Sequence, residues 1–356
     1  MKIAIDAREL HGKPTGVGRF LQELLAAWAT MPEAQEHEFV PLAPERSAAT
    51  GGTLWEQMVL PALARDAGAD VLFAPAYSGP ILPPMPMVVA IHDVSYAAHP
   101  EWFAWREGAR RRTSVQLSAR AAARIITISE FSKREIVAHL GIDDARVVVV
   151  YPGVTPFTSG TSLEGLSHRN GVLFVGSIFN RRHVPELIDG FGRLARANPD
   201  LHLDIVGENR TSPRVNLESI VRATGVADRI HLRSYVPDEE LRALYATASA
   251  FAFLSEYEGF GLTPLEALAS GLPVLLLDTA VAREVCADAA RYVPRPQPAL
   301  VEAGLRLLMF DAGERLRILD AATRVLARYS WTDCARRVLR VLVDAANRGR
   351  QRSGPR

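Results

Sequence analysis

The sequence predicts an α/β fold built from two doubly wound, Rossmann-like domains. Three observations support this prediction. At 356 residues the chain is longer than one hydrophobic core usually supports, short apolar runs alternate with longer amphipathic ones, and this alternation occurs twice. Most of the apolar runs are uninterrupted stretches of Val, Ile and Leu, which is typical of parallel strands covered by helices on both faces.

Six strands are expected in the first domain and five in the second. The predicted strands are residues 3–5, 39–42, 71–73, 88–91, 125–128 and 147–150, then 172–175, 201–206, 230–232, 250–254 and 274–277. Helical patterns such as RFLQELLAAWA, PELIDGFGRLARA and DEELRALYATA separate them. Strands that alternate with helices in this way predict βαβ units.

Composition places the domain boundaries. The segment Pro152–Gly171 is rich in Gly, Pro, Ser and Thr, which favours a linker. An amphipathic helix is expected near the C-terminus, followed by a polar, basic tail that should fray. The predicted parts are a first domain 1–155, a linker 156–170, a second domain 171–330, a helix 331–346 that crosses back to the first domain, and a tail 347–356.

Charge and cysteine content narrow the function classes. The chain has 41 basic and 40 acidic residues, a balance that gives no argument for a nucleic-acid partner. Cys286 and Cys334 are too few for a disulfide framework or a cysteine metal site. No Asp-x-Asp pair follows a strand, so no metal is expected. The charged N-terminus and the lack of an 18-residue apolar run predict a cytoplasmic protein.

Two pairs of residues follow strands of the first domain. Gly16 and Gly18, with Val17 between them, lie between the first strand and a helix, where glycines let a backbone approach a ligand. The dinucleotide fingerprint is incomplete, so the pattern alone favours a tight βα turn. His92 and Asp93 follow a buried strand, where ligands of open sheets bind. His92 could donate a hydrogen bond to a sugar, or cap a neighbouring element; both interpretations stay open.

Two further constellations lie in the second domain. Gly176 and Ser177 follow its first strand, and Arg181 and Arg182 precede a helix expected near Val184. Paired guanidinium groups beside a helix N-terminus suit a diphosphate, whereas surface arginines are more often simply solvated. Their position after the first strand of a βα unit favours the diphosphate.

The stretch EYEGFGLTPLE carries two carboxylates, Glu258 and Glu266, on either side of a glycine turn. Thr263 to Glu266 fits a capping box with Pro264 as the first helical residue, which gives Glu266 a structural role. Glu258 has no such role and is expected to accept hydrogen bonds from sugar hydroxyls. The amides of Gly261 and Leu262 are expected to face a phosphate.

At these residues the chain resembles glycosyltransferase family 4, the retaining enzymes with two Rossmann-like domains facing across a cleft (GT-B). SEYEGFGLTPLEALASGLPVL resembles the family's E-x7-E signature, and DARELHGKPTGVGRF, VVAIHDVSYAAHPEWF and ITISEFSKREIVAHLGIDDARVVVVYPGV resemble a bacterial subgroup. VGSIFNRRHVPELI resembles its phosphate motif, usually Arg-Lys. Arg182 stands at the second position here, which keeps the charge but replaces a compact ammonium with a guanidinium.

The resemblance implies a role for each candidate. Four would be catalytic: Glu258 would hold the donor sugar, Arg181 and Arg182 would stabilise the leaving diphosphate, and His92 would line the sugar site from the first domain. Glu266 would bind the ribose. Other expected substrate contacts are Gly16, Val17, Gly18, Asp93, Gly176, Ser177, Gly259, Phe260, Gly261, Leu262 and Thr263. The nucleotide sugar is a substrate, and no cofactor is implied.

The expected function is transfer of a hexose, with GDP-mannose as the predicted donor, to a glycan or lipid-linked acceptor in surface polysaccharide synthesis. A sugar-nucleotide epimerase of the same fold and a non-catalytic nucleotide-sugar-binding partner are the alternatives. Six arginines in the segment 105–124 (Arg106, Arg110, Arg111, Arg112, Arg120 and Arg124) are expected on one helix. They could contact the inner face of the plasma membrane or form a solvated face.

Overall fold

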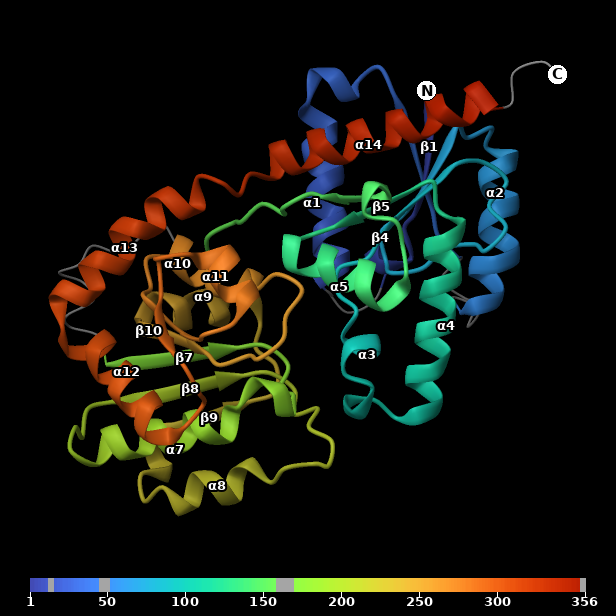
Figure 1. The fold of residues 1–356 in the computed structure, drawn as a ribbon. Coiled ribbons are helices and arrows are strands. Elements are labelled where there is room, and N and C mark those ends of the chain that lie inside the picture. Colours follow the sequence, from blue (N-terminus) through green and yellow to red (C-terminus); the bar gives the residue numbers. More distant parts are fainter. Residues whose placement is uncertain (12–15, 45–51, 158–169, 353–356) are drawn as a thin grey trace. The chain divides into compact units, whose positions relative to one another are not determined.

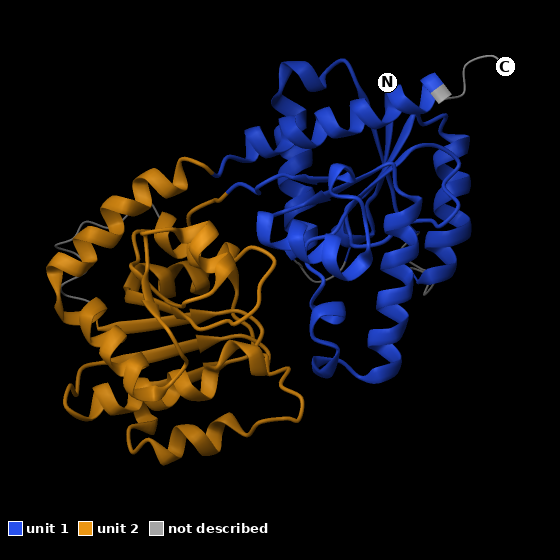
Figure 2. Ribbon diagram, in the orientation of Figure 1, with its two compact units in different colours: residues 1–153, 329–356 blue, residues 154–328 orange. Residues whose placement is uncertain are grey.

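The computed structural model describes residues 1–11, 16–44, 52–157 and 170–352 (Figure 1). The chain forms two compact units (Figure 2). Unit 1 comprises residues Met1–Gly153 and Tyr329–Arg356, and unit 2 comprises Val154–Arg328. The predicted linker falls mostly outside the described residues, as does the end of the predicted tail.

Unit 1 contains a six-stranded parallel sheet in the order β2-β1-β3-β4-β5-β6. The strands are β1 Lys2–Asp6, β2 Glu38–Leu42, β3 Val71–Ala74, β4 Met87–Ala90, β5 Arg124–Thr127 and β6 Val147–Val149. The helices are α1 Gly16–Thr30, α2 Leu60–Asp66, α3 Ser95–Ala98, α4 Trp105–Ala121, α5 Glu130–Leu140 and α14 Trp331–Arg352, and a π-helical turn, η3, spans Trp55–Val59.

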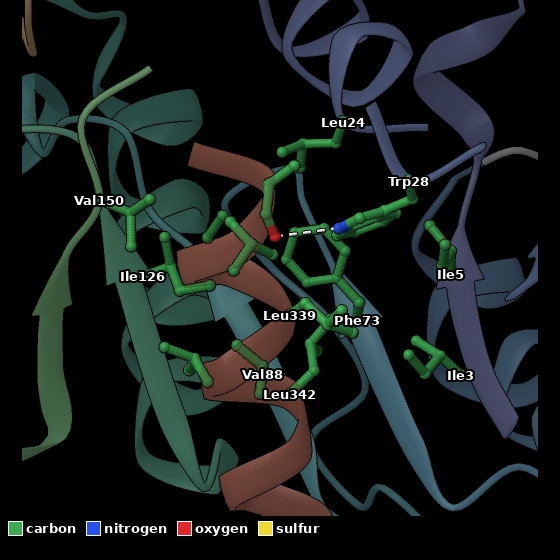
Figure 3. Close-up of a cluster of buried hydrophobic side chains, with 14 of the residues drawn as sticks. Ile3, Ile5, Leu24, Trp28, Phe73, Val88, Ile126, Val150, Leu339 and Leu342 are labelled. Atoms are coloured by element: carbon green, nitrogen blue, oxygen red, sulfur yellow. Dashed lines mark hydrogen bonds between the residues drawn. The ribbon is translucent and has the colours of Figure 1, made fainter. Parts of the chain in front are cut away.

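Alternate residues of the same strands bury opposite faces of this sheet. Ile3 and Ile5 of β1 join a core covered by α1 and α14, whereas Ala4 between them joins a core covered by α2, α4 and α5. In the first core the indole Nε1 of Trp28 on α1 donates to the carbonyl of Ala335 on α14, at 2.9 Å (Figure 3). Helix α14 is therefore an integral part of unit 1 although it is last in sequence.

Unit 2 contains a second six-stranded parallel sheet in the order β12-β11-β10-β7-β8-β9. The strands are β7 Gly171–Val175, β8 His202–Val206, β9 Ile230–Arg233, β10 Ala248–Phe253, β11 Val274–Leu277 and β12 Arg291–Val293. The helices are α7 Val184–Arg196, α8 Leu217–Ala223, α9 Asp238–Thr247, α10 Leu262–Ala269, α11 Ala280–Cys286, α12 Pro298–Phe310 and α13 Ala312–Leu326.

All eleven predicted strands are present, and among the described residues one further strand, β12, was not predicted. Strand β12 has only three residues, of which Val293 alone is buried, so it gives no apolar run. The prediction that the C-terminal helix ends at Ala346 was wrong, because α14 continues to Arg352. Two contacts hold the extra turns on unit 1: Arg350 pairs with Asp70 at 2.7 Å, and Gly349 lies against Pro86.

Candidate functional site

The loops after β7 and β10 meet at the switch point of the unit 2 sheet. These strands are neighbours, but the chain continues from β7 to β8 on one side and from β10 to β11 on the other. Ligands of open parallel sheets bind where the strand order reverses in this way, beyond the carboxyl ends of the strands. The loop after β7 carries the turn Asn180–Arg182, and the loop after β10 carries Glu258.

Arg182 and Glu258 are joined directly across this switch point. The guanidinium Nε and Nη2 of Arg182 lie 2.8 and 2.7 Å from Oε1 of Glu258, and Nη1 donates to the Ser177 carbonyl at 2.8 Å. The hydroxyl of Ser255 donates to the same Glu258 oxygen at 2.9 Å. The two charged side chains are only 13 and 19 % exposed, so the pair is largely shielded from solvent.

The backbone of Gly176 permits this arrangement. A Cβ at Gly176, whose φ is +145°, would lie 2.7 Å from Nη1 of Arg182. The Arg182 guanidinium is 4.9 Å from the centre of the Phe253 ring, and that of Arg181 is 4.2 Å from the Phe179 ring. Both predicted arginines therefore reach this edge of the sheet, and Arg182 is the one that pairs with Glu258.

The predicted capping box was wrong. Helix α10 begins at Leu262, with Gly261 as its N-cap at φ +101°, and no side chain caps it. Thr263 and Pro264 thus lie inside the first turn, two residues further into the helix than predicted. The left-handed φ of Gly261 lets the helix start earlier than the Thr-Pro pattern indicates. Glu266 faces inward and is 4 % exposed.

A pocket borders Glu258 on the side of β11. Its empty volume, including solvent at the mouth, is about 310 Å³. Ser255, Glu258 and Thr279 are the residues of its lining that carry a hydroxyl or a carboxylate, and Gly261 also belongs to the lining. The other lining residues are mainly apolar and include Phe260, which is 3 % exposed. Cys286 also lines it; burial raises the pKa of this thiol to about 12, which keeps it protonated at neutral pH.

In unit 1, His92 lies at the carboxyl end of β4 and is 7 % exposed. Its Nε2 is 2.8 Å from the Pro75 carbonyl, which can only accept, so Nε2 carries the proton. Burial lowers the pKa of His92, which favours the neutral ring. His92 was expected to donate a hydrogen bond to a sugar. Its Nε2–H is instead bonded within unit 1, and the neutral ring offers Nδ1 as a hydrogen-bond acceptor.

Asp93 is engaged by its own surroundings. One carboxylate oxygen accepts from the Tyr77 hydroxyl at 2.8 Å and the other from the Ser95 amide at 2.9 Å. Tyr77 has φ +65°, a conformation that costs a non-glycine residue about 1–2 kcal/mol. A ligand hydroxyl at Asp93 would therefore share a carboxylate that already has two partners.

The predicted glycine loop is the first turn of α1, which begins at Gly16; Lys13 to Thr15 lie outside the described residues. Gly16 is exposed, Val17 is partly exposed and Gly18 is buried. A Cβ at Gly16 would meet no described atom within 4 Å, so packing alone does not require a glycine there. Space for a close ligand remains a reason for this residue.

Sequence reasoning missed a buried charged cluster at the other switch point, between β1 and β3. The Arg8 guanidinium lies 2.6 Å from an oxygen of Asp6 and 2.8 Å from one of Glu56, and the Ser78 hydroxyl donates to Glu56 at 2.8 Å. Burial raises the pKa of Asp6, and its bonds to Arg8 oppose that shift. The cluster ties β1 to the π-helical turn η3 and to the loop after β3.

Two family models match the chain in succession. "Glycosyltransferase Family 4" matches residues 15–156, and "Glycosyl transferases group 1" matches residues 164–325. The chain belongs to glycosyltransferase family 4. The first match ends three residues past the boundary between units 1 and 2, and the second lies wholly within unit 2, so each unit carries essentially one of the two models.

Relatives of this family 4 chain include O-antigen chain mannosyltransferase B of Escherichia coli, 28 % identical over 69 % of this chain and 67 % of that protein. A glycosyltransferase of Methanocaldococcus jannaschii is 26 % identical over 63 % of this chain, and the match spans 61 % of the archaeal protein. HepE of Anabaena in complex with UDP-glucose has a TM-score of 0.74 at 18 % identity, covering 97 % of this chain and all of that one. The likeness shows the GT-B fold.

Ser255, Glu256 and His183 are site residues that sequence reasoning missed. Ser255 bonds to Glu258, and His183 contacts Glu256. Ser255 and Glu256 stand inside the signature stretch, but nothing in the sequence distinguishes them from ordinary loop residues. Among the described residues, no group of three or more His, Cys, Asp or Glu side chains is placed to hold a metal ion.

Proposed function

We propose that the protein is a retaining glycosyltransferase that moves a hexose from a nucleotide sugar to a glycan or lipid-linked acceptor. The observation that carries this proposal is the Arg182–Glu258 pair at the switch point of unit 2, next to Ser177 and the pocket. The pair places a cation that can bind a diphosphate directly beside a carboxylate that can bind sugar hydroxyls. Family membership supports the same reaction class.

In this proposal the diphosphate takes over the donors of Arg182, with Arg181 beside it, and Glu258 turns its oxygens to the sugar. The bond between the anomeric carbon and the phosphate oxygen breaks, and its electron pair leaves with the nucleoside diphosphate. The acceptor oxygen bonds to the same face of the sugar and gives its proton to the leaving phosphate. Fixed guanidinium groups stabilise the charge that develops on that phosphate.

Mannose is the proposed hexose, with GDP-mannose as donor. Two relatives named as mannosyltransferases support it: the E. coli O-antigen enzyme and the MMP alpha-(1->4)-mannosyltransferase of Mycolicibacterium hassiacum, 28 % identical over 74 % of this chain. Thermal unfolding with GDP-mannose, UDP-glucose and ADP-glucose tests the choice. A donor at 100 times its dissociation constant should stabilise the protein by about 2.7 kcal/mol. Stabilisation by UDP-glucose alone would overturn the GDP assignment, and no shift with any donor would undercut the function.

Two alternatives separate cleanly from a transferase. An epimerase needs no acceptor, so its turnover should be unchanged when a candidate acceptor glycan is added, whereas a transferase should release nucleoside diphosphate faster. A non-catalytic binding partner would bind donor without turnover, and Glu258→Ala would then leave product formation in a reconstituted mixture undiminished.

We also propose peripheral contact with an anionic membrane, where a lipid-linked acceptor would be found. One face of α4 carries Arg106, Arg110, Leu117 and Arg120, all exposed and at helical spacing. Arg124 does not belong to this face, because it begins β5, which corrects the expectation of six helical arginines. None of the described helices is long and apolar enough to span a bilayer.

Two exposed apolar side chains stand in segments that contact this helix. Leu82 is 88 % exposed and Met58 is 65 % exposed. Their segments are joined to α4 through Gly79, whose carbonyl accepts from both Gln57 and Ser118. Flotation with anionic and zwitterionic vesicles tests the contact. Leu82→Asp and Arg110→Glu should each reduce binding to anionic vesicles, and Leu316→Asp, at an exposed site in unit 2, should not. Equal binding by all three variants and the unmodified protein would contradict the proposal.

A further inference from the structure

His183 lies between the turn after β7, which carries Arg182, and the loop after β10, which carries Glu258. It follows Arg182 directly and is the N-cap of α7, with φ +49° and ψ +40°. This left-handed conformation is strained for a residue with a Cβ, so the surroundings must hold it in place. Its side chain is 18 % exposed and contacts two carboxylates: Nε2 is 3.2 Å from Glu256, and Nδ1 is 3.6 Å from Glu186.

Three contacts join the turn after β7 to the loop after β10. Arg182 pairs with Glu258, the Glu256 amide donates to the Arg181 carbonyl at 2.9 Å, and His183 contacts the Glu256 carboxylate. Guanidinium groups in general do not lose their charge in proteins, and a backbone hydrogen bond does not titrate. The His183–Glu256 contact is therefore the one of these three that changes its charge near neutral pH.

The charges around the ring favour its protonated form. Glu186 faces it from α7 and Glu256 from the loop after β10, whereas the Arg182 guanidinium is directed to Glu258 and the Ser177 carbonyl. Burial works to lower the pKa of His183, but hydrogen bonds and attraction to Glu186 and Glu256 outweigh it and raise the pKa above 6.5. A cation is disfavoured at a helix N-terminus, so these carboxylates are what retain the proton.

We propose that His183 is a positioning residue: its imidazolium bridges Glu186 and Glu256 and so holds the loop of Glu258 in register with the turn of Arg182. The proposal rests on the function proposed above, which assigns Arg182 to the diphosphate and Glu258 to the sugar. Deprotonation weakens the bridge, and donor affinity should fall as pH rises through the pKa of His183.

Titration calorimetry with GDP-mannose and UDP-glucose from pH 5.5 to 8.5 tests the proposal, because only a sugar-bearing donor engages both Arg182 and Glu258. The unmodified protein should bind its preferred donor about three- to tenfold more tightly at low pH, relative to His183→Asn at the same pH, and this ratio should approach one at high pH. Asparagine suits the variant because it tolerates the left-handed backbone. The ligand's own phosphate titration is common to both proteins and cancels in the ratio.

Three further measurements fix the interpretation. Glu256→Gln should move the midpoint of the ratio to lower pH, and His139→Asn, which removes an exposed pair with Glu135 on α5, should behave like the unmodified protein. An NMR titration of the ligand-free protein should place the His183 pKa above 6.5 and lower it in Glu256→Gln. A ratio independent of pH overturns the positioning role alone, whereas absence of nucleotide binding at any pH overturns the proposed function as well.

Discussion

Arg182 and Glu258 neutralise each other in the ligand-free site, and this pairing has a cost for any anion that binds there. A diphosphate must compete with Glu258 for the same guanidinium, while Ser177 and Ser255 keep both side chains in position. The carboxylate thus restrains the affinity for free nucleotide and holds Arg182 ready for a donor. Its two roles, restraint of the arginine and contact with sugar, can be separated experimentally.

Glu258→Gln should tighten the binding of free nucleoside diphosphate, by about three- to tenfold, because a like-charged neighbour is removed from the phosphate. The same variant should slow sugar transfer. Arg182→Met should weaken nucleotide binding. Calorimetry and a transfer assay measure the two effects, and weaker nucleotide binding by Glu258→Gln would contradict the competition.

The cluster of Asp6, Arg8 and Glu56 gives a second prediction at the scale of single residues. Arg8→Met leaves two buried carboxylates without their cation and should lower the free energy of unfolding by about 3–5 kcal/mol at pH 7. Buried carboxylates without a cation have raised pKa values, so the loss should shrink as pH falls and they protonate. Urea unfolding measures it. Arg111→Met, in an exposed pair with Glu107, should cost less than about 1 kcal/mol.

At the scale of elements, close helix packing depends on where glycines stand. Gly190 lies in α7 against α12, and a Cβ there would lie 2.7 Å from the Cβ of Val301 and 3.0 Å from the Pro298 carbonyl. Neither neighbour is the free end of a flexible side chain. Gly108 in α4 has more room, since its Cβ would be 3.4 Å from the Cβ of Phe103.

The same substitution should therefore have opposite effects in the two helices. Alanine gains about 0.5–1 kcal/mol over glycine inside a helix. At Gly108 this gain should appear as increased stability. At Gly190 overpacking costs about 1–3 kcal/mol and should outweigh it. Denaturant unfolding of Gly108→Ala and Gly190→Ala measures the difference, and a stabilised Gly190→Ala would show that α12 can move away without cost.

Sequence reasoning succeeded for elements with a strong local signal and failed where tertiary structure decides. Buried parallel strands appear in the sequence as apolar runs, so β7 and β10 could be predicted. Strand β12 is too short to give such a run. The start of α10 was misplaced because the left-handed φ of Gly261 is not visible in a Thr-Pro-x-Glu pattern. The Arg182–Glu258 contact spans 76 positions and follows from strand order, which local patterns do not contain.

At the scale of the whole molecule, unit 1 is assembled from both ends of the sequence. Its core includes Val338 and Leu342 of α14 packed with residues of α1 and β3. Each such side chain contributes about 1.5–3 kcal/mol when buried, and a domain's entire stability is about 5–15 kcal/mol. The buried residues of α14 together thus contribute a stabilisation comparable to the whole free energy of unfolding expected for a domain such as unit 1.

A chain ending at Arg328 should retain a folded unit 2 and lose the cooperative unfolding of unit 1. All five tryptophans lie in unit 1, so their fluorescence reports on that unit during urea unfolding. Far-ultraviolet circular dichroism follows both units, and the two signals together distinguish them. Arg336→Ala, which removes surface ion pairs with Glu33 and Asp333, should leave both transitions in place. A truncated chain that still unfolds with a native-like unit 1 transition would show that α14 is dispensable.

The return of α14 to unit 1 also orders events on the ribosome. Translation supplies the strands of unit 1 first, yet the helix that covers one face of their sheet follows unit 2 in the sequence and emerges after it. Unit 2 can fold as soon as residue 328 has left the exit tunnel. Until α14 follows, one apolar face of the unit 1 sheet stays uncovered. Unit 1, whose synthesis begins first, is thus the unit that is completed second. Chaperones that shield nascent chains would be needed most during that delay.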